Sequence, residues 1–137
     1  MEYSADLMPG TVTLVGGGPG DPGLVTVAGL QAVQQADVIL YDRLAPQSIM
    51  DENPDAEKIP VGKVPRGKYV PQEEINLLLV EHAQQGRKVV RLKGGDSFVF
   101  GRGGEEWQAC AAAGVPVRII PGVTSCVAGP ELAGVPL

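Results

Sequence analysis

Short apolar segments alternate with longer amphipathic ones along this chain, and this alternation limits the fold more than any other feature. The apolar runs predict five strands, at 11–16, 37–42, 57–62, 88–93 and 115–122. Apolar residues at helical spacing predict helices at 25–36, 70–86 and 105–114. Because helices supply the crossovers that parallel strands need, we expect an α/β fold with a five-stranded, mainly parallel sheet flanked by helices.

The segment 70–86 is the clearest helix in the sequence. Pro71 suits a first helical turn, the acids Glu73 and Glu74 favour a helix start, and Gly86 suits the end. The face expected to be buried comprises Ile75, Leu78, Leu79 and Ala83.

The other two helices also carry recognisable signals. In 25–36, Thr26 can cap the helix start. In 105–114, we expect Trp107 to anchor the helix in the core. The apolar residues of 25–36 that fall at helical spacing are Val27, Leu30 and Val33.

Composition narrows the class of protein. With 44% hydrophobic residues among 137, the chain can bury a core, and no run of about 18 apolar residues offers a membrane span. The start of the chain carries no basic residue, which argues against a signal or transit peptide.

Cys110 and Cys126 lack C-x-x-C spacing, so we expect reduced, buried thiols in a cytoplasmic protein. With one histidine and no cysteine cluster, we expect no metal site.

The net charge of −5 is unevenly distributed. Residues 1–57 hold nine acids and one base, whereas residues 58–102 hold nine bases and four acids. A basic middle segment in an acidic protein suggests a local anion site rather than nucleic-acid coating. Ordinary solvated surface charge is the alternative that composition leaves open.

Residues 18–23, Gly-Pro-Gly-Asp-Pro-Gly, match the G-x-G-x-x-G pattern of dinucleotide-binding loops. They lie between a predicted strand and a predicted helix, and Asp42 ends the next strand, where an acid would bind ribose hydroxyls. Two features oppose a pyrophosphate. Pro19 and Pro22 lack the N–H groups that bind phosphate, and Asp21 adds a negative charge where the phosphate charges would lie. The loop better suits a cationic or zwitterionic ligand that approaches the backbone closely.

A second glycine-rich loop follows the fourth predicted strand. Gly94 and Gly95 let the backbone come near a ligand. Asp96 sits at the carboxyl end of a strand, the edge at which open α/β sheets bind ligands. Two tight turns without a ligand remain the alternative.

Six motifs occur in order along the chain: VGGGPGDPGLVT, ADVILYDRL, VGK, PQEEIN, VVRLKGGDSFVFGRGGEE and PGVTS. Together they resemble the uroporphyrinogen-III C-methyltransferases of the tetrapyrrole methylase family, from about Thr11 to Leu137. The resemblance implies transfer of methyl groups from S-adenosyl-L-methionine, which becomes S-adenosyl-L-homocysteine, to uroporphyrinogen III. The product would be precorrin-2, on the route to sirohaem or cobalamin. The resemblance also implies a cytoplasmic homodimer without nucleic-acid or membrane partners.

The resemblance covers one of the family's two α/β domains. We expect residues 1–10 to be an N-terminal extension and 11–137 to be the N-terminal domain. The second domain would complete the cleft, so this chain alone is expected to bind cofactor weakly and not to turn over substrate. A Rossmann-type NAD(P)-binding oxidoreductase domain is the alternative, and it predicts binding of NADPH. The sequence leaves open whether the pathway feeds sirohaem or cobalamin, and whether the native protein is fused to a dehydrogenase/ferrochelatase module.

The resemblance also assigns roles to residues. Asp42 of YDRL matches the family's proposed proton acceptor, and Lys63 of VGK matches its proposed donor. Ser97 stands where the family usually has proline, which removes no functional group. The expected cofactor contacts are Pro19, Gly94, Gly95, Asp96, Val99, Thr124 and Ser125.

The expected chemistry suits these residues. A pyrrole carbon loses a proton as it gains a methyl group, and a carboxylate such as that of Asp42 can accept the proton. Lys63 could donate a proton or hold a substrate carboxylate, and both roles stay open. The positive sulfonium of the cofactor would tolerate nearby carboxylates. A polycarboxylate substrate gives the basic segment a purpose. Lys63, Arg66 and Lys68 form a candidate clamp, and Arg43 and Arg102 are expected near the cleft as further substrate-binding residues.

Overall fold

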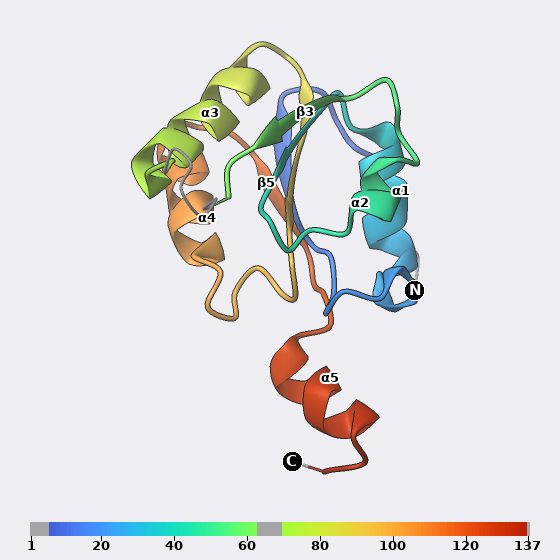
Figure 1. Ribbon diagram of the computed structural model, residues 1–137. Helices are drawn as coiled ribbons and strands as arrows, with labels where there is room; N and C mark the ends of the chain where they lie inside the picture. Colours follow the sequence, from blue (N-terminus) through green and yellow to red (C-terminus); the bar gives the residue numbers. More distant parts are fainter. Residues whose placement is uncertain (1–5, 63–69, 137) are drawn as a thin grey trace.

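The computed structural model describes residues 6–62 and 70–136 and is shown in Figure 1. Its sheet has five strands in the order β3-β2-β4-β1-β5, and every pairing between them is parallel. The expected α/β class is confirmed, and the sheet is wholly rather than mainly parallel. The strands are β1 (Thr11–Gly16), β2 (Val38–Tyr41), β3 (Glu57–Pro60), β4 (Lys88–Lys93) and β5 (Val117–Ile120).

Helices cover both faces of the sheet (Figure 1). The helices α1 (Val27–Gln35) and α2 (Gln47–Met50) lie on one side, and α3 (Gln72–Gln84) and α4 (Gly103–Ala112) on the other. The last helix, α5 (Ser125–Leu132), projects away from the sheet. The three predicted helices are confirmed, whereas α2 and α5 were not expected from the sequence. Within the part of the chain that the structure describes, no helix is long and apolar enough to cross a membrane.

Local signals set the helix ends. Thr26 precedes α1, and its Oγ1 accepts a hydrogen bond of 2.9 Å from the N–H of Gly29, as a capping residue should. Pro71 occupies the extended position before α3 rather than its first turn. Gly86 follows α3 with a φ of +80°, a conformation that glycine adopts without strain. Val27 was expected on the buried face of α1 but is 64% exposed, because the face that packs on the sheet is that of Gly29, Ala32 and Val33.

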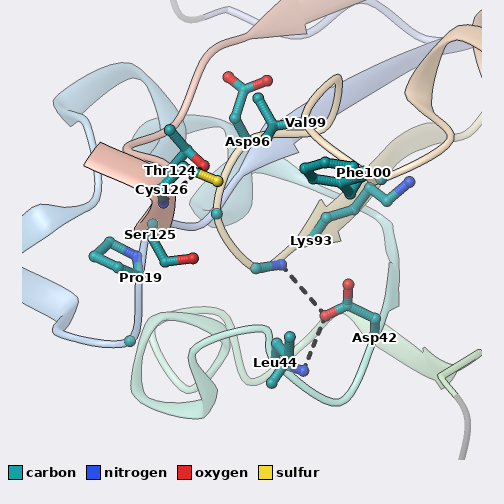
Figure 2. A pocket seen from close by; sticks show the side chains of 15 residues that line it. Pro19, Asp42, Leu44, Lys93, Asp96, Val99, Phe100, Thr124, Ser125 and Cys126 are labelled. Atoms are coloured by element: carbon teal, nitrogen blue, oxygen red, sulfur yellow. Dashed lines mark hydrogen bonds between the residues drawn. The ribbon is translucent and has the colours of Figure 1, made fainter. Parts of the chain in front are cut away.

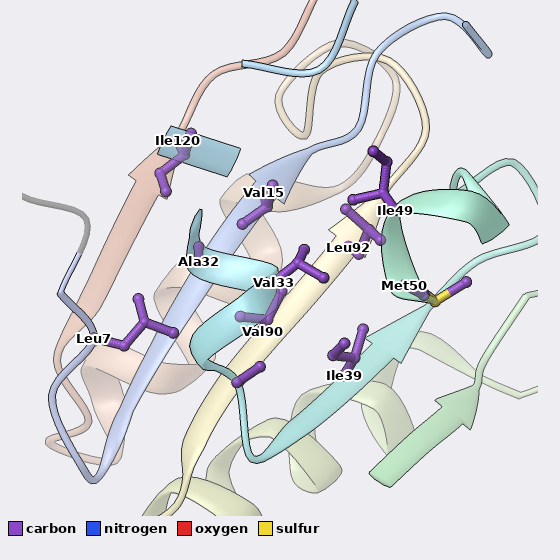
Figure 3. Packing of buried hydrophobic residues seen from close by; sticks show 11 residues of the cluster. Leu7, Val15, Ala32, Val33, Ile39, Ile49, Met50, Val90, Leu92 and Ile120 are labelled. Atoms are coloured by element: carbon purple, nitrogen blue, oxygen red, sulfur yellow. The ribbon is translucent and has the colours of Figure 1, made fainter. Parts of the chain in front are cut away.

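One half of the core lies between the sheet and the helices α1 and α2 (Figure 3). Val90 and Leu92 alternate along β4 and so point to this side. Leu7, from the segment expected to be an N-terminal extension, packs into the same cluster. The cluster also contains Val15, Ala32, Val33, Ala36, Ile39, Ile49, Met50 and Ile120.

The other half of the core lies under α3 and α4. The predicted face of α3 is confirmed, since Ile75, Leu79 and Ala83 are buried and Leu78 is half-buried. The expectation for Trp107 is wrong, because its side chain is 44% exposed. The position of α4 that faces the sheet belongs instead to Glu106, which is fully buried against two cations of β4.

Two leucines of α3 test this packing. Leu79 is fully buried and Leu77 is 60% exposed, so they form a matched pair on one helix. We expect Leu79→Ala to lower the free energy of unfolding by about 2–5 kcal/mol, the cost of a core cavity. Urea denaturation of the two variants measures the difference. Equal, small losses for Leu79→Ala and Leu77→Ala would contradict the packing described.

Candidate active site

Three loops meet at the carboxyl edge of the sheet, where β4, β1 and β5 end side by side. Backbone hydrogen bonds join the first two loops: the N–H of Gly17 donates to the carbonyl of Lys93 at 2.6 Å. Gly18 and Gly95 exchange a pair of such bonds, at 3.1 and 2.7 Å. The loop after β5 joins them through Asp96, whose Oδ2 accepts from the N–H of Gly122 at 3.0 Å.

Glycine is required where these loops cross. A Cβ added at Gly122 would lie 2.2 Å from the carbonyl oxygen of Gly95, and one added at Gly16 would lie 2.6 Å from the nitrogen of Gly122. Real side chains do not tolerate such contacts with backbone. The glycines therefore allow three backbones to approach one another more closely than any other residue would permit.

A hollow of about 350 Å³ opens beside this crossing (Figure 2). All seven residues expected to contact a cofactor line it, as does Asp42. In Figure 2, Pro19 and Thr124 lie on one side of the hollow, and Asp42 and Phe100 lie on the other. The lining residues are Gly18, Pro19, Gly20, Asp42, Leu44, Lys93, Gly94, Gly95, Asp96, Val99, Phe100, Gly101, Thr124, Ser125 and Cys126.

The carboxylate of Asp42 is held in place by backbone groups. Its Oδ1 accepts hydrogen bonds from the N–H groups of Leu44 at 3.0 Å and Gly94 at 3.3 Å (Figure 2). Within 6–62 and 70–136, no hydrogen bond reaches its Oδ2. One oxygen therefore orients the carboxylate, and the other can accept a proton from a bound molecule.

The carboxylate of Asp96 links two loops through hydrogen bonds. Its Oδ1 accepts one from the N–H of Phe98 at 2.9 Å, and its Oδ2 accepts one from the N–H of Gly122. The carboxylate thus ties the loop after β4 to the loop after β5. The neighbouring Ser97 is buried, and its Oγ makes no hydrogen bond to the described residues, so this hydroxyl contributes nothing to the loop that another small residue would lack.

The G-x-G-x-x-G loop does not form a phosphate cradle. Asp21 Oδ1 accepts from the N–H of Gly23 at 2.7 Å, and the Asp21 carbonyl accepts from the N–H of Leu24 at 2.9 Å. At the start of α1, Thr26 Oγ1 accepts a hydrogen bond from the N–H of Gly29. The N–H groups of Gly18, Gly23 and Leu24 are therefore used within the chain and are not directed together at a pyrophosphate, as in a dinucleotide-binding loop.

A buried ion triad lies behind the hollow, and sequence reasoning missed it. Glu106 Oε2 lies 2.7 Å from Nε of Arg91, and Glu106 Oε1 binds Nζ of Lys93. All three side chains are 5% exposed or less. Burial lowers the pKa of Lys93, an effect that the carboxylates of Glu106 and Asp42 oppose. The available signal was the spacing of Arg91 and Lys93, which places both on the strand face that α4 covers.

The expected substrate residues lie in different places. Arg43 is exposed and lines a neighbouring hollow of about 270 Å³, which also includes Asp42. Arg102 is exposed at the start of α4 and is not among the residues that line the site. Lys63, Arg66 and Lys68 lie outside the described residues.

The two cysteines differ, and one expectation is wrong. Both are free thiols, but Cys126 is exposed and lines the hollow, whereas Cys110 is buried. Cys126 is exposed because it lies in the first turn of α5, which has little of the protein around it. Burial, with a smaller contribution from Glu106, raises the pKa of Cys110 to about 11. In residues 6–62 and 70–136, no group of three or more His, Cys, Asp or Glu could hold a metal ion.

Two adjacent glutamates test the buried triad. Glu106→Gln leaves two buried cations without a counter-charge, so we expect it to cost about 3–5 kcal/mol of unfolding free energy. Glu105→Gln is the control, because Glu105 is exposed in the same turn. Chemical denaturation compares the two. A loss below about 1 kcal/mol for Glu106→Gln would show that the triad does not carry the assigned charge.

Thiol alkylation tests the cysteine assignment. At pH 8.5 the native protein should take up one label, at Cys126, because Cys110 is buried and its raised pKa keeps it protonated. In urea both thiols should react. Peptide mass spectrometry identifies the labelled residue, and fast native labelling of Cys110 would contradict this arrangement.

Comparison with known proteins agrees with this geometry. The chain is 54% identical over 131 residues to the siroheme synthase of Photorhabdus laumondii, covering 95% of the chain and 28% of that protein. It is 58% identical over 129 residues to siroheme synthase 1 of Serratia proteamaculans, covering 93% and 27% respectively. The chain therefore spans little more than a quarter of these relatives.

Solved structures resemble this chain in fold as well as in sequence. A uroporphyrin-III C-methyltransferase from Thermus thermophilus matches with a TM-score of 0.82 and 43% identity, over 93% of this chain and 54% of that one. A crystal structure of the enzyme from the same organism with S-adenosyl homocysteine matches with a TM-score of 0.77 and 49% identity, over 87% and 51%. A Rossmann-type oxidoreductase finds no support in these matches. The model of the tetrapyrrole (corrin/porphyrin) methylases matches residues 11–137, and the chain therefore belongs to this family.

Proposed function

We propose that this chain is the N-terminal α/β domain of an S-adenosyl-L-methionine-dependent methyltransferase that converts uroporphyrinogen III to precorrin-2, in sirohaem or cobalamin biosynthesis. The observation that carries the proposal is the single hollow in which Asp42 and all seven expected cofactor residues meet. The names of the related proteins support the reaction and the cofactor.

The residues of the hollow fit this cofactor. Its volume of about 350 Å³ lies within the range of small-molecule sites. Glycine backbone and the apolar side chains of Pro19 and Val99 form much of its lining, which suits a flat adenosine group. The carboxylate of Asp42 suits a positive sulfonium, and no cradle of N–H groups demands phosphate. When bound, the cofactor supplies an electrophilic methyl group.

Asp42 is the proposed proton acceptor. A pyrrole carbon that formed a bond to the methyl group, as the bond between this methyl group and sulfur broke, would leave the pyrrole with a proton to release. Asp42 lines the hollow; its Oδ1 is fixed by two backbone N–H groups, and its Oδ2 accepts no hydrogen bond from the described residues. This fixed orientation avoids the cost of positioning the base during the reaction.

Basic residues would hold the carboxylates of the substrate. Arg43 stands beside Asp42 at the mouth of the neighbouring hollow, where its guanidinium can pair with a carboxylate. Lys63 is proposed as either a proton donor or a further carboxylate ligand. Arg66, Lys68 and Arg102 complete the proposed basic surface.

We propose no metal and no nucleic-acid or membrane partner.

The full-length protein is proposed to be a cytoplasmic homodimer whose second domain closes the cleft. The length of the relatives supports a second domain. Side chains on and after α5 also support it, since Val127, Leu132 and Val135 are exposed by 38%, 78% and 55%. Apolar residues gathered at one end of a domain suit contact with further protein.

Asp42→Asn in the full-length protein tests the proposed base. Asparagine keeps an oxygen for the N–H groups of Leu44 and Gly94 but cannot take the proton. We expect methylation of uroporphyrinogen III to fall by about 10²–10⁴-fold, with the affinity for S-adenosyl-homocysteine within about twofold of wild type, since general-base loss does not remove ground-state binding. Asp55→Asn, at an exposed carboxylate outside the hollow, should leave both unchanged.

Calorimetric titration of the wild type separates this proposal from the alternative. The full-length protein should bind S-adenosyl-homocysteine and ignore NADPH, and this chain alone should bind the same ligand more weakly. Binding of NADPH without S-adenosyl-homocysteine would contradict the proposed function. Full activity in Asp42→Asn would leave the function standing and remove Asp42 as the base.

A further inference from the structure

Three large apolar side chains stand exposed on the lining of the hollow. Phe100 is 97% exposed, Leu44 is 70% exposed and Val99 is 37% exposed. Leu44 belongs to the loop after β2, whereas Val99 and Phe100 belong to the loop after β4. Apolar surface gathered from two separate loops at a concave site marks a place where a partly apolar ligand binds.

The backbone holds Phe100 in this position at a cost. Phe100 has a φ of +54° and Arg102 a φ of +55°, a region that bulky residues rarely adopt. The loop is closed by the N–H of Gly103, which donates to the carbonyl of Ser97 at 2.9 Å. A Cβ at Gly101 would lie 2.5 Å from that same carbonyl oxygen, so the turn is tightly wound. Backbone strain of this kind collects at functional sites.

Phe100 lies on the same side of the hollow as Asp42, the proposed proton acceptor (Figure 2). Pro19, Thr124 and Ser125, which are proposed to contact the cofactor, stand opposite, whereas Val99, another proposed cofactor contact, lies beside Phe100. The reacting pyrrole ring must lie within reach of both the transferred methyl group and the carboxylate of Asp42. Phe100 and Leu44 line the same hollow as Asp42, so a ring held there can contact their exposed side chains.

We propose that Phe100 and Leu44 form an apolar platform that receives the face of a pyrrole ring of the tetrapyrrole substrate and thereby determines substrate affinity. This inference rests on the proposed function. A pyrrole ring has an apolar face, while the carboxylates of the substrate lie at its periphery. Aromatic side chains favour such faces, and Arg43 beside the platform can take a peripheral carboxylate.

Two phenylalanines of one loop provide a matched test in the full-length enzyme. Phe98 is 50% exposed but does not line the hollow. We expect Phe100→Ala to raise KM for uroporphyrinogen III by about tenfold or more, because the variant loses an aromatic contact that the bound substrate would bury. The affinity for S-adenosyl-homocysteine should stay within about twofold. Phe98→Ala should leave KM unchanged, Phe100→Tyr should restore it, and Leu44→Ala should raise it in the same direction.

The outcomes separate the two proposals. A wild-type enzyme that does not methylate uroporphyrinogen III overturns the proposed function, and the platform with it. An active wild type whose KM is unaffected by Phe100→Ala overturns the platform alone. Weakened binding of S-adenosyl-homocysteine, or a change of oligomeric state in Phe100→Ala, also overturns it, because Phe100 would then serve the cofactor or a protein contact.

Discussion

The crossing of three backbones at Gly16, Gly95 and Gly122 is the constraint on which the site depends. Parallel strands bring their carboxyl ends to one edge, but ordinary residues would keep the following loops apart by the width of their side chains. At this crossing the backbones approach to distances that exclude any Cβ, and hydrogen bonds between loops fix the contact. The hollow is the space left beside this contact. Its walls are therefore positioned by main-chain geometry, which is more rigid than side-chain packing alone.

The charged groups around the hollow divide between bracing and chemistry. Both carboxylate oxygens of Asp96 accept hydrogen bonds from backbone N–H groups, and both oxygens of Glu106 form ion pairs with buried cations. Among these three, only Asp42 has one anchored oxygen and one that accepts no hydrogen bond from the described residues. This division fits the proposal that a single carboxylate, that of Asp42, acts as the base although several acids lie close to the site. The charge of Asp42 also opposes the lowering of the Lys93 pKa by burial.

Much of the fold followed from periodicity, because buried strands and the amphipathic helix α3 carry strong local patterns. The loops of the site followed from motif order, and the hollow brings them together. The errors have physical causes. Hydrophobicity favoured Trp107 as the core residue of α4, but the two cations of β4 placed Glu106 there instead. Gly129 and Pro130 obscured α5, although Thr124 caps it. The exposure of Cys126 depends on how α5 projects from the sheet, and that of Phe100 depends on the geometry of its loop; the hydrophobic pattern of the sequence encodes neither.

The order of strands has a consequence for how the chain is made. Thr11 of β1 pairs with Lys88 of β4, and Val12 pairs with Val117 of β5. Within this domain, β1 is therefore synthesised well before the two strands that pair with it. Contacts between such distant positions form slowly, because the intervening chain must be ordered first. During that delay Val12–Val15 lacks its strand partners, and the edges of unpaired strands are prone to association with other chains.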